Sequence, residues 1–415
     1  MDELEKKLRV KKGNKMNKRV VVTGIGVICP SGNNLGETWD ALLKGKCAFS
    51  QSKYPQVHFY GEVDHNYSNS LSKKEIRYMD KTSQFAVLAA REAVADSKLD
   101  IEKEKAIICI GSAMGGMETL TYEIGESAKE GMNKITVLGM PKLLSNMISS
   151  NISIDFGISG GAYTYNSACA SSAIAFGEAY KKLQYGEVTV ALAGGAESCI
   201  VEQVFASFLR LGAISQSDAI DRASLPFSKH RAGFVLSEGA AILVLEEYEH
   251  AVARNANIYA EILGYGTSSD ARSLVAPDLE GIKLCINRAL EDAQLCPEEI
   301  EYINAHGTGT QANDVTEGRA LSQIFRNNPY VSSSKSMHGH LLGAAGALEI
   351  AVCCMMIKNN VLLPQINVAK EDVDDELRNL NLLLDKPIKY SGNPVMTNSF
   401  GFGGDNASII LGHYK

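Results

Sequence analysis

Residues 163–176 read "YTYNSACASSAIAF", and this stretch carries the strongest signal for the fold. A short strand-like run at 163–166 leads to Cys169, which stands among alanines and serines, and a helix-like run follows at 170–184. This order predicts a strand, a tight turn and a helix with one thiol at the junction. The thiol has two interpretations: a small hydrophobic residue in a packed core, or a nucleophile that a substrate approaches closely from one side.

The same alternation of strand and helix extends outward from this unit within the first part of the chain. Continuous apolar strands that alternate with helices predict α/β layers in which the sheet is covered on both faces. The predicted elements are a strand at 19–30, a helix at 80–99, a strand with a glycine-rich turn at 106–117, a helix at 141–157 that ends at Gly157, a strand at 188–198, and two strands with a short helix at 233–255.

A similar order recurs after residue 256, which indicates a duplicated fold. We therefore expect a charged N-terminal extension at 1–16, a first half at 17–256 that holds the cysteine, and a second half at 257–415 that holds two histidine loops. The elements predicted in the second half are a strand with a glycine turn at 257–271, a helix at 279–294, a strand with a polar loop at 300–310, a helix at 313–326, a strand, loop and helix at 328–357, and a strand pair at 393–412.

Composition excludes several classes of function. The 415 residues are 45% hydrophobic and 21% charged with a net charge of −7, which is typical of a globular enzyme and argues against a nucleic-acid surface. No apolar run approaches the roughly 20 residues that span a bilayer, and the charged N-terminus is neither a signal peptide nor an anchor. Nine cysteines without metal-ligand spacing or a disulfide framework favour a reducing, cytoplasmic setting.

Cys169 lies where a helix is predicted to begin. Unpaired N–H groups at a helix start favour negative charge, so we expect the pKa of this thiol to be lowered. Two loops rich in glycine, serine and threonine supply separate imidazoles: "NAHGTGT" holds His306, and "SKSMHGHLLGAAG" holds Lys335, His338 and His340. A single histidine after a strand is more often structural, but two such loops suit a nucleophile with assisting groups.

A fourth segment, "NSFGFGGDN" at 398–406, is rich in glycine. Its glycines permit unusual backbone angles and let N–H groups approach a ligand closely, so the loop can supply one arm of an oxyanion hole. A hairpin turn between the last two strands is the other interpretation, and the two are compatible.

In order, the motifs "VVVTGIGVICPSG", "NSACASSA", "ALAGGAES", "PFSKHRAGFVLSEGAA", "NAHGTGTQANDVTE", "SKSMHGHLLGAAGALE" and "NSFGFGGDNAS" resemble those of elongating β-ketoacyl-[acyl-carrier-protein] synthases. The resemblance covers nearly everything from about Lys18 to the end. It implies a thiolase-like duplicated fold, layered α-β-α-β-α, with two five-stranded mixed sheets. It also implies decarboxylative condensation of a cysteine-bound acyl group with malonyl-carrier protein, without metal, flavin or nicotinamide.

The resemblance implies roles for individual residues. Cys169 corresponds to the acylated nucleophile, His306 and His340 to the pair that promotes decarboxylation, and Lys335 and Glu349 to residues that support this pair. The N–H groups of Cys169 and Phe402 correspond to the oxyanion hole, and the Phe402 ring to a gate. Thr308 and Thr310 correspond to hydroxyls that hold the phosphopantetheine arm, and Met114 to a residue that lines the acyl tunnel near a dimer interface.

Three positions depart from the family pattern: Asp405 and His338 stand where threonine is usual, and Ser228 stands where aspartate is common. We hypothesise that Asp405 and His338 form a compensating pair that sets the gate. The alternative is that Asp405 is a solvated turn aspartate without a partner. Such changes leave room for a specialised pathway, such as a polyketide or polyene ketosynthase.

The implied partner is acyl-carrier protein, with a homodimer or a heterodimer with a chain-length-factor-like subunit, and no nucleic acid or membrane. An acidic carrier would dock on a local basic patch, for which Lys229, Arg231 and Arg272 are candidates. Alternatives are the ketosynthase subunit of a type II polyketide system that works with a Cys-less partner, a non-catalytic chain-length or scaffold subunit, and a thiolase. Cys169 argues against the scaffold. Thiolases use a second cysteine near the C-terminus, and none follows Cys354.

Overall fold

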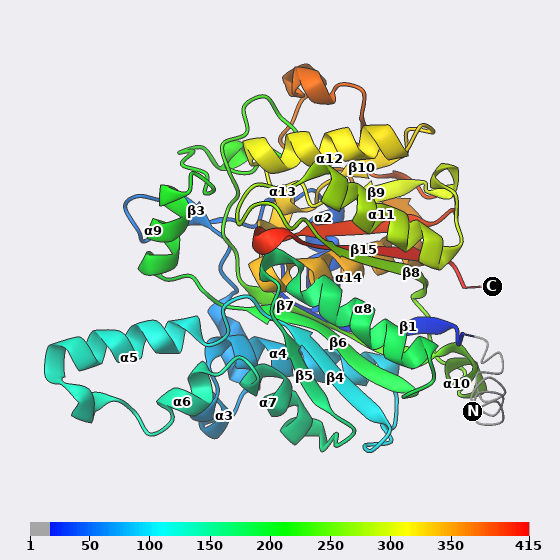
Figure 1. Cartoon of the computed structure of the whole chain (residues 1–415). Helices are drawn as coiled ribbons and strands as arrows, with labels where there is room; N and C mark the ends of the chain where they lie inside the picture. The colour runs from blue at the N-terminus through cyan, green and yellow to red at the C-terminus, as the bar shows by residue number, and fades with distance from the viewer. Residues whose placement is uncertain (1–16, 415) are drawn as a thin grey trace, which may run out of the picture.

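Strands and helices alternate along the chain in the computed structural model, which describes residues 17–414 (Figure 1). The extension expected at 1–16 lies outside these residues. The strands are β1 (Val20–Ile28), β2 (Ser50–Gln51), β3 (Phe59–Tyr60), β4 (Ala106–Gly111), β5 (Ala162–Tyr165), β6 (Val190–Glu197), β7 (Gly239–Glu247), β8 (Ala260–Ser269), β9 (Tyr302–Asn304), β10 (Tyr330–Ser332), β11 (Val361–Leu362), β12 (Asn381–Leu382), β13 (Ile388–Lys389), β14 (Val395–Phe400) and β15 (Asp405–Gly412).

The α-helices cover the strands and connect them. They are α2 (Leu35–Leu43), α3 (Lys73–Tyr78), α4 (Lys81–Ser97), α5 (Met117–Glu130), α6 (Gly139–Leu143), α7 (Met147–Phe156), α8 (Ser171–Gln184), α9 (Glu202–Arg210), α10 (Tyr248–Ala253), α11 (Leu279–Ala293), α12 (Gln311–Ile324), α13 (Lys335–His338) and α14 (Ala345–Asn359).

The main sheet is continuous, so the expectation of two separate five-stranded sheets is wrong. Its strand order is β12-β10-β9-β14-β15-β8-β1-β7-β6-β4-β5, which gives eleven strands. The first half of the chain supplies β5, β4, β6, β7 and β1, and the second half supplies the rest. The two groups are joined because β1 also pairs with β8, antiparallel, where Val20–Val22 lie opposite Ala260–Ile262.

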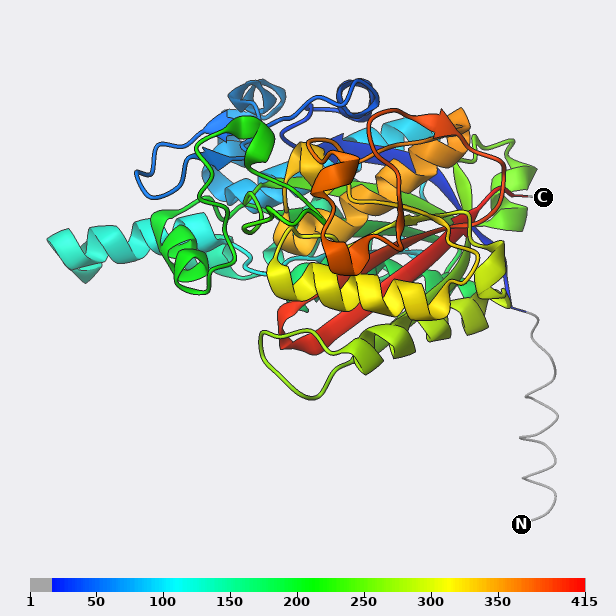
Figure 2. The same cartoon turned by 90° about the horizontal axis from the view of Figure 1, so that it is seen from above.

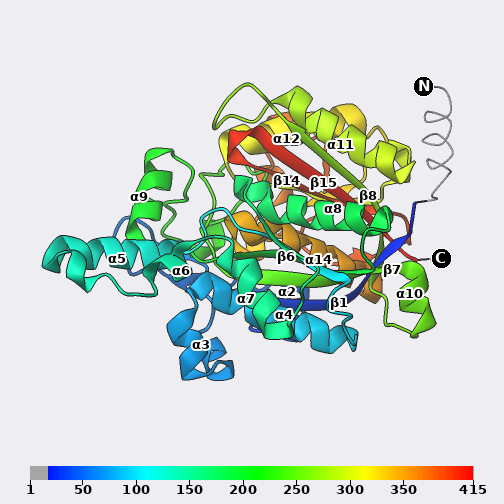
Figure 3. The same ribbon diagram turned by 60° about the horizontal axis from the view of Figure 1, so that its bottom comes forward.

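The expected five layers are present. Helices α8 and α14 lie side by side between the two parts of the sheet (Figures 1 and 3). Helices α4 and α7 cover the outer face of the first part, and α11 covers the outer face of the second part with α12 beside it. One apolar cluster joins buried residues of α8 and α14 to strands from both halves. The beginnings of the two middle helices therefore meet inside the molecule.

Element boundaries follow local signals in some places and tertiary contacts in others. Helix α7 ends where predicted, at Gly157, which has a φ of 69° that few other residues adopt. It begins only at Met147, because 139–143 form the separate helix α6. The two strands expected in 233–255 reduce to one, β7. Residues before it form only isolated bridges, such as Leu236 with His340, because they run past the second histidine loop.

The segment from α5 to α6 projects from the rest of the molecule (Figure 2). It exposes many apolar side chains: Tyr122, Ile124, Met132, Ile135, Val137, Met140 and Leu144. We call this segment, residues 117–144, the arm. An exposed apolar surface of this kind is typical of an interaction site.

One segment is long and apolar enough to resemble a membrane span. It is Leu342–Asn359, which includes α14, and 83% of it is buried inside the protein. Its apolar character is explained by its place in the middle layer, where most of its side chains pack in one apolar cluster.

Candidate active site

Cys169 lies in a strained turn between β5 and α8. It is the middle residue of a 3₁₀ turn, Ala168–Ala170, and the preceding Ala168 has a φ of 47°, in the left-handed region that alanine rarely adopts. Ser171 holds the turn, because its hydroxyl donates to the carbonyl of Ala168 over 2.6 Å and accepts from the N–H of Ser167 over 2.9 Å. Strain of this kind is stored where a side chain must be presented in one direction.

The thiol is more deeply buried than a helix start alone would suggest. Burial raises the pKa of Cys169 to about 12, although Lys335 and the N–H of Phe402 oppose the shift. The expectation of a lowered pKa is therefore wrong for the free protein, because desolvation of a thiolate outweighs the helix start. The raised pKa favours the protonated thiol at neutral pH in the free protein.

His306 and His340 meet Cys169 inside the protein. The sulfur and one ring nitrogen from each histidine all lie within 4.8 Å of one another. The two rings are nearly perpendicular, with centroids 5.4 Å apart. Burial, helped by the charge of Lys335, lowers the pKa of both imidazoles well below its usual value, so both are neutral at pH 7.

Lys335 and Glu349 stand behind the histidines as a buried ion pair. Nζ of Lys335 also lies 3.4 Å from Nδ1 of His306. An ammonium can only donate, so this contact requires a lone pair on Nδ1 and places the ring proton on Nε2. Burial raises the pKa of Glu349, against the effect of Lys335.

By composition, one cysteine and two histidines could hold a metal ion. A metal would need a lone pair on the inward ring nitrogen of His306. The proton that Lys335 directs to Nε2 makes this nitrogen a hydrogen-bond donor instead. His306 therefore presents a donor to the cavity, and both ring nitrogens of the buried His340 lack a hydrogen-bond partner among residues 17–414, so its N–H is free to act as a second donor.

The glycine-rich loop between β14 and β15 forms another wall of the site. It is both a hairpin turn and a neighbour of the thiol, because the N–H of Phe402 approaches Cys169. Gly403 has a φ of 87° and donates its N–H to the carbonyl of Leu274 over 2.8 Å. The Phe402 ring stacks on Phe208 at a centroid distance of 6.3 Å.

A cavity of about 410 Å³ opens above the reactive groups. Its lining includes Cys169, His306, His340 and Phe402, and also both threonines of the first histidine loop, Thr308 and Thr310. The hydroxyls of these threonines lie 2.9 Å apart.

Met114 lies outside this lining and instead packs against an apolar cluster that also contains Cys169, Cys199 and Phe205. The thiol therefore has a polar-edged cavity next to it and an apolar region that contains Met114.

Sequence analysis missed three buried carboxylates that shape the site. Glu197 accepts N–H groups from Ala113, Met114 and Gly343, and Glu317 accepts those of His306 and Gly307. Burial raises the pKa of both to about 7. The third, Asp314, accepts from Gly309 over 3.2 Å. The i, i+3 spacing of Asp314 and Glu317 on one helix, directly after the histidine loop, could have indicated their shared face.

The proposed pairing of Asp405 with His338 is wrong. The buried His338 ring contacts the carbonyl of Gly339 at 2.8 Å and the hydroxyl of Ser334 at 3.0 Å, so both of its nitrogens have local partners. Asp405 is the first residue of β15 and lies opposite Ser269, and no ion pair joins its carboxylate to His338 within residues 17–414. The third departure, Ser228, donates its hydroxyl to the carbonyl of Asp372.

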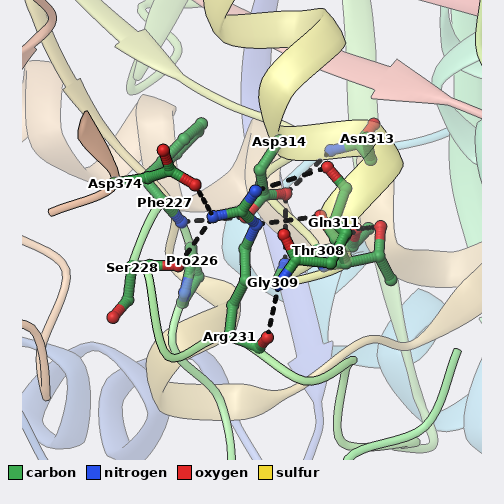
Figure 4. Close-up of polar contacts among 12 residues, drawn as sticks. Pro226, Phe227, Ser228, Arg231, Thr308, Gly309, Gln311, Asn313, Asp314 and Asp374 are labelled. Atoms are coloured by element: carbon green, nitrogen blue, oxygen red, sulfur yellow. Dashed lines mark hydrogen bonds and ion pairs between the residues drawn. The ribbon is translucent and has the colours of Figure 1, made fainter. Parts of the chain in front are cut away.

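The candidate basic patch also needs correction. The side chain of Arg231 is completely buried and paired with Asp374, so it cannot form part of a docking surface (Figure 4). Lys229 is 3.3 Å from Asp372, and Arg272 is 3.2 Å from Asp278, so the two exposed candidates already have acidic neighbours. Burying the charge of Arg231 costs free energy, and acidic partners such as Asp374 compensate that cost.

Comparisons with known proteins agree with this geometry. Residues 17–251 match the family described as "Beta-ketoacyl synthase, N-terminal domain", and residues 259–369 match "Beta-ketoacyl synthase, C-terminal domain". The chain therefore belongs to the β-ketoacyl synthase family. It is similar to the 3-oxoacyl-[acyl-carrier-protein] synthase 2 of Staphylococcus aureus (strain COL), with 39% identity over 414 residues that cover 96% of this chain and 99% of the relative.

Two solved structures are similar along the same length. One is described as the ishigamide ketosynthase/chain length factor, with a TM-score of 0.91 and 33% identity over 96% of this chain and 100% of that chain. The other is a type II PKS acyl-carrier protein in complex with its ketosynthase bound to the hexaketide, with a TM-score of 0.89, 29% identity and the same coverage.

Proposed function

We propose that this protein is a 3-oxoacyl-[acyl-carrier-protein] synthase, an acyltransferase that elongates acyl chains by decarboxylative condensation. The observation that carries the proposal is one thiol and two neutral imidazoles within 4.8 Å of one another, beside a cavity edged by two threonine hydroxyls. The similarity to 3-oxoacyl-[acyl-carrier-protein] synthase 2 along nearly the whole chain supports the same reaction.

In the first step the acyl group moves from the carrier thiol to Cys169. The sulfur attacks the thioester carbon, the bond to the carrier sulfur breaks, and the thiol proton passes to the departing sulfur. The N–H groups of Cys169 and Phe402 would stabilise the negative oxygen that forms on the way. The apolar side chains around Met114 offer a suitable place for the acyl chain.

In the second step a malonyl thioester loses carbon dioxide. The electrons of the broken C–C bond form an enolate, whose oxygen needs hydrogen-bond donors. His306 and His340 would supply them from their inward nitrogens, and neutral imidazoles can do this without first losing a proton. Thr308 and Thr310 would hold the phosphopantetheine arm that carries the malonyl group.

In the third step the enolate carbon attacks the acyl carbonyl on Cys169. A new C–C bond forms, the C–S bond breaks, and the sulfur leaves as a thiolate that takes up a proton. The acyl group supplies the electrophile, and the malonyl group supplies the carbanion when it loses carbon dioxide, so the site requires no resident cofactor in this scheme. The phosphopantetheine arm belongs to the carrier protein.

The site also fits the ketosynthase subunit of a type II polyketide synthase, because the same three steps extend a polyketide. The similarity to the ishigamide ketosynthase/chain length factor and to the type II PKS complex favours this second candidate. Cys169 separates both candidates from a non-catalytic chain-length subunit. We place either enzyme in the cytoplasm, where its cysteines stay reduced.

We further propose that the protein acts as a dimer, with a copy of itself or with a related subunit. The arm exposes apolar side chains, and β5 lies at the edge of the main sheet with Tyr163 exposed, so a partner could cover the arm and extend the sheet. Within each chain we assign residues 17–256 and 257–415 to two thiolase-like halves.

The test is incubation with acyl- and malonyl-carrier proteins, followed by mass analysis of the protein and the products. We expect one acyl group on Cys169, a product two carbons longer, and loss of both with Cys169→Ala, because alanine fits a site of small residues. The matched control is Cys296→Ala, at an exposed thiol, which should leave both unchanged. Condensation by Cys169→Ala, or no condensation with any carrier-bound substrate, would contradict the proposal.

A further inference from the structure

Arg231 is buried beside the two threonines that edge the cavity, although its own side chain lines no part of that cavity. It belongs to the loop before β7 and reaches the start of α12 (Figure 4). A buried guanidinium is expensive unless its donors are satisfied. Its partners therefore indicate what the residue is for.

Two of these partners are carbonyl groups at the beginning of α12. Nε of Arg231 donates to the carbonyl of Thr310 over 3.2 Å, and one terminal nitrogen donates to that of Gln311 over 3.4 Å. The side chain of Gln311 donates back to the carbonyl of Arg231 over 3.0 Å. Beside this contact, the N–H of Gly233 donates to the carbonyl of Gly309 over 2.9 Å. The loop that contains Arg231 thus holds the chain from Gly309 to Gln311, directly after Thr308.

Two carboxylates from separate segments of the second half of the chain compensate the charge. The other terminal nitrogen of Arg231 is 2.6 Å from Asp374, and Nε is 3.8 Å from Asp314. Asp314 is also tied to the threonine loop, because it accepts from the N–H of Gly309. One planar guanidinium, with several N–H donors, therefore links three segments of the chain. The compact ammonium of a lysine cannot contact all of these partners.

We infer that Arg231 is a positioning residue that fixes the Thr308–Thr310 loop so that its two hydroxyls can hold the polar arm of the substrate. The inference rests on the proposed function. Gly309, between the threonines, has a φ of 75° and no side chain to limit its movement. Without the guanidinium, this loop loses the hydrogen bonds to the carbonyl groups of Thr310 and Gln311 that fix its backbone.

The experiment compares wild type with Arg231→Lys, which keeps the positive charge but loses the planar guanidinium and its several donors. We expect KM for malonyl-carrier protein to rise about tenfold, as for the loss of an interaction worth about 1.4 kcal/mol, while kcat changes by less than about threefold. Alkylation of Cys169 by iodoacetamide should keep its rate, because this reagent has no arm for the threonines to hold.

Two further variants separate positioning from general stability. Arg254→Lys is the matched control, because Arg254 is also paired with a fully buried carboxylate, Glu246, but contacts no residue of the cavity. It should lower the melting temperature without changing KM. Thr308→Val should raise KM by itself and add little in combination with Arg231→Lys, since both act through the same contact.

If Arg231→Lys does not fold, Asp374→Asn provides the same test at a position that is partly exposed, with a smaller expected rise in KM. A normal KM in a folded variant, additive effects with Thr308→Val, or a parallel loss of iodoacetamide reactivity would each overturn the inference. A wild-type protein that turns over no carrier-bound substrate would instead overturn the proposed function, and this inference with it.

Discussion

Nζ of Lys335 lies 3.4 Å from Nδ1 of His306 while the same ammonium is paired with the buried carboxylate of Glu349. One cation thus sets the proton position on an imidazole and neutralises a charge in the core. These two tasks can be separated by mutation, because only the first involves His306.

We predict that Lys335→Met destabilises the protein by about 3 kcal/mol at pH 8, because it leaves Glu349 buried without a partner. The loss should shrink toward pH 5, where the carboxylate takes up a proton. Adding Glu349→Met should restore most of the stability but not malonyl decarboxylation, since His306 still lacks its donor. Urea unfolding and the release of carbon dioxide measure the two effects. Full decarboxylation in the double variant would contradict the role of Lys335.

His306 and His340 should matter most for the malonyl step. We predict that alanine at either position lowers condensation by about 10²-fold or more, as for the loss of one donor to a developing oxyanion. Acylation of Cys169 should suffer less, because it uses the backbone N–H groups instead. The two half-reactions can be followed separately by protein mass and by carbon dioxide release. Variants that lose acylation and keep decarboxylation would reverse the assignment.

His338 should give stability a measurable pH dependence. Burial, together with Lys335, lowers its pKa to about 3 in the folded protein, whereas the unfolded chain titrates near 6.5. Below pH 6.5 the unfolded state binds a proton that the folded state does not, so stability present above 6.5 is lost as the pH falls.

His338→Thr removes this contribution, which amounts to at most about 1.4 kcal/mol per pH unit for a single proton. Urea unfolding of both proteins between pH 7.5 and 5 should therefore show a flatter profile for the variant. Identical slopes in the two proteins would mean that His338 does not resist protonation as its burial implies.

The arm should control the oligomeric state. We predict that Val137→Asp shifts sedimentation toward a monomer at micromolar concentration, because Val137 is 96% exposed and a charge there would be buried by a partner. Leu284→Asp, at an exposed leucine on α11, is the control and should not change sedimentation. A monomeric wild type, or an unchanged Val137→Asp variant, would exclude the arm as an interface of identical copies.

Local sequence signals were sufficient for much of the fold and for the meeting of Cys169, His306 and His340. A strand-to-helix junction with small residues and a glycine-rich histidine loop each have a common structural interpretation, but together and in this order along the chain they resemble one family. The continuity of the main sheet was not predictable, since it depends on only three residue pairs between β1 and β8. The roles of Thr310, Met114 and Phe402 remain predictions, as do those of Thr308 and Glu349, which two of the variants above address.

Two electrostatic predictions were wrong, the surface position of Arg231 and the lowered pKa of Cys169, because both depend on burial by distant parts of the chain. Arg231 lies in the polar run "SKHRAG", which suggests a surface, but its partners Asp314 and Asp374 are far away in the sequence. The pKa of Cys169 was expected to fall because only the helix start was visible, whereas desolvation by distant elements raises it. Neighbours in sequence carry little information about either effect.

The small residues after Cys169 also set a distance. Helix α8 begins just after Cys169 and α14 just after His340, and the two helices touch where a Cβ added to Gly346 would lie 2.9 Å from that of Ala173. The N–H of Ala347 donates to the hydroxyl of Ser172 over 2.9 Å at the same crossing. A single extra methyl group there would push the helices apart and lengthen the gap between sulfur and imidazole. Small residues at the crossing of α8 and α14, which do not line the cavity, thus help to set the distance between the nucleophile and the groups that act on its reaction partner.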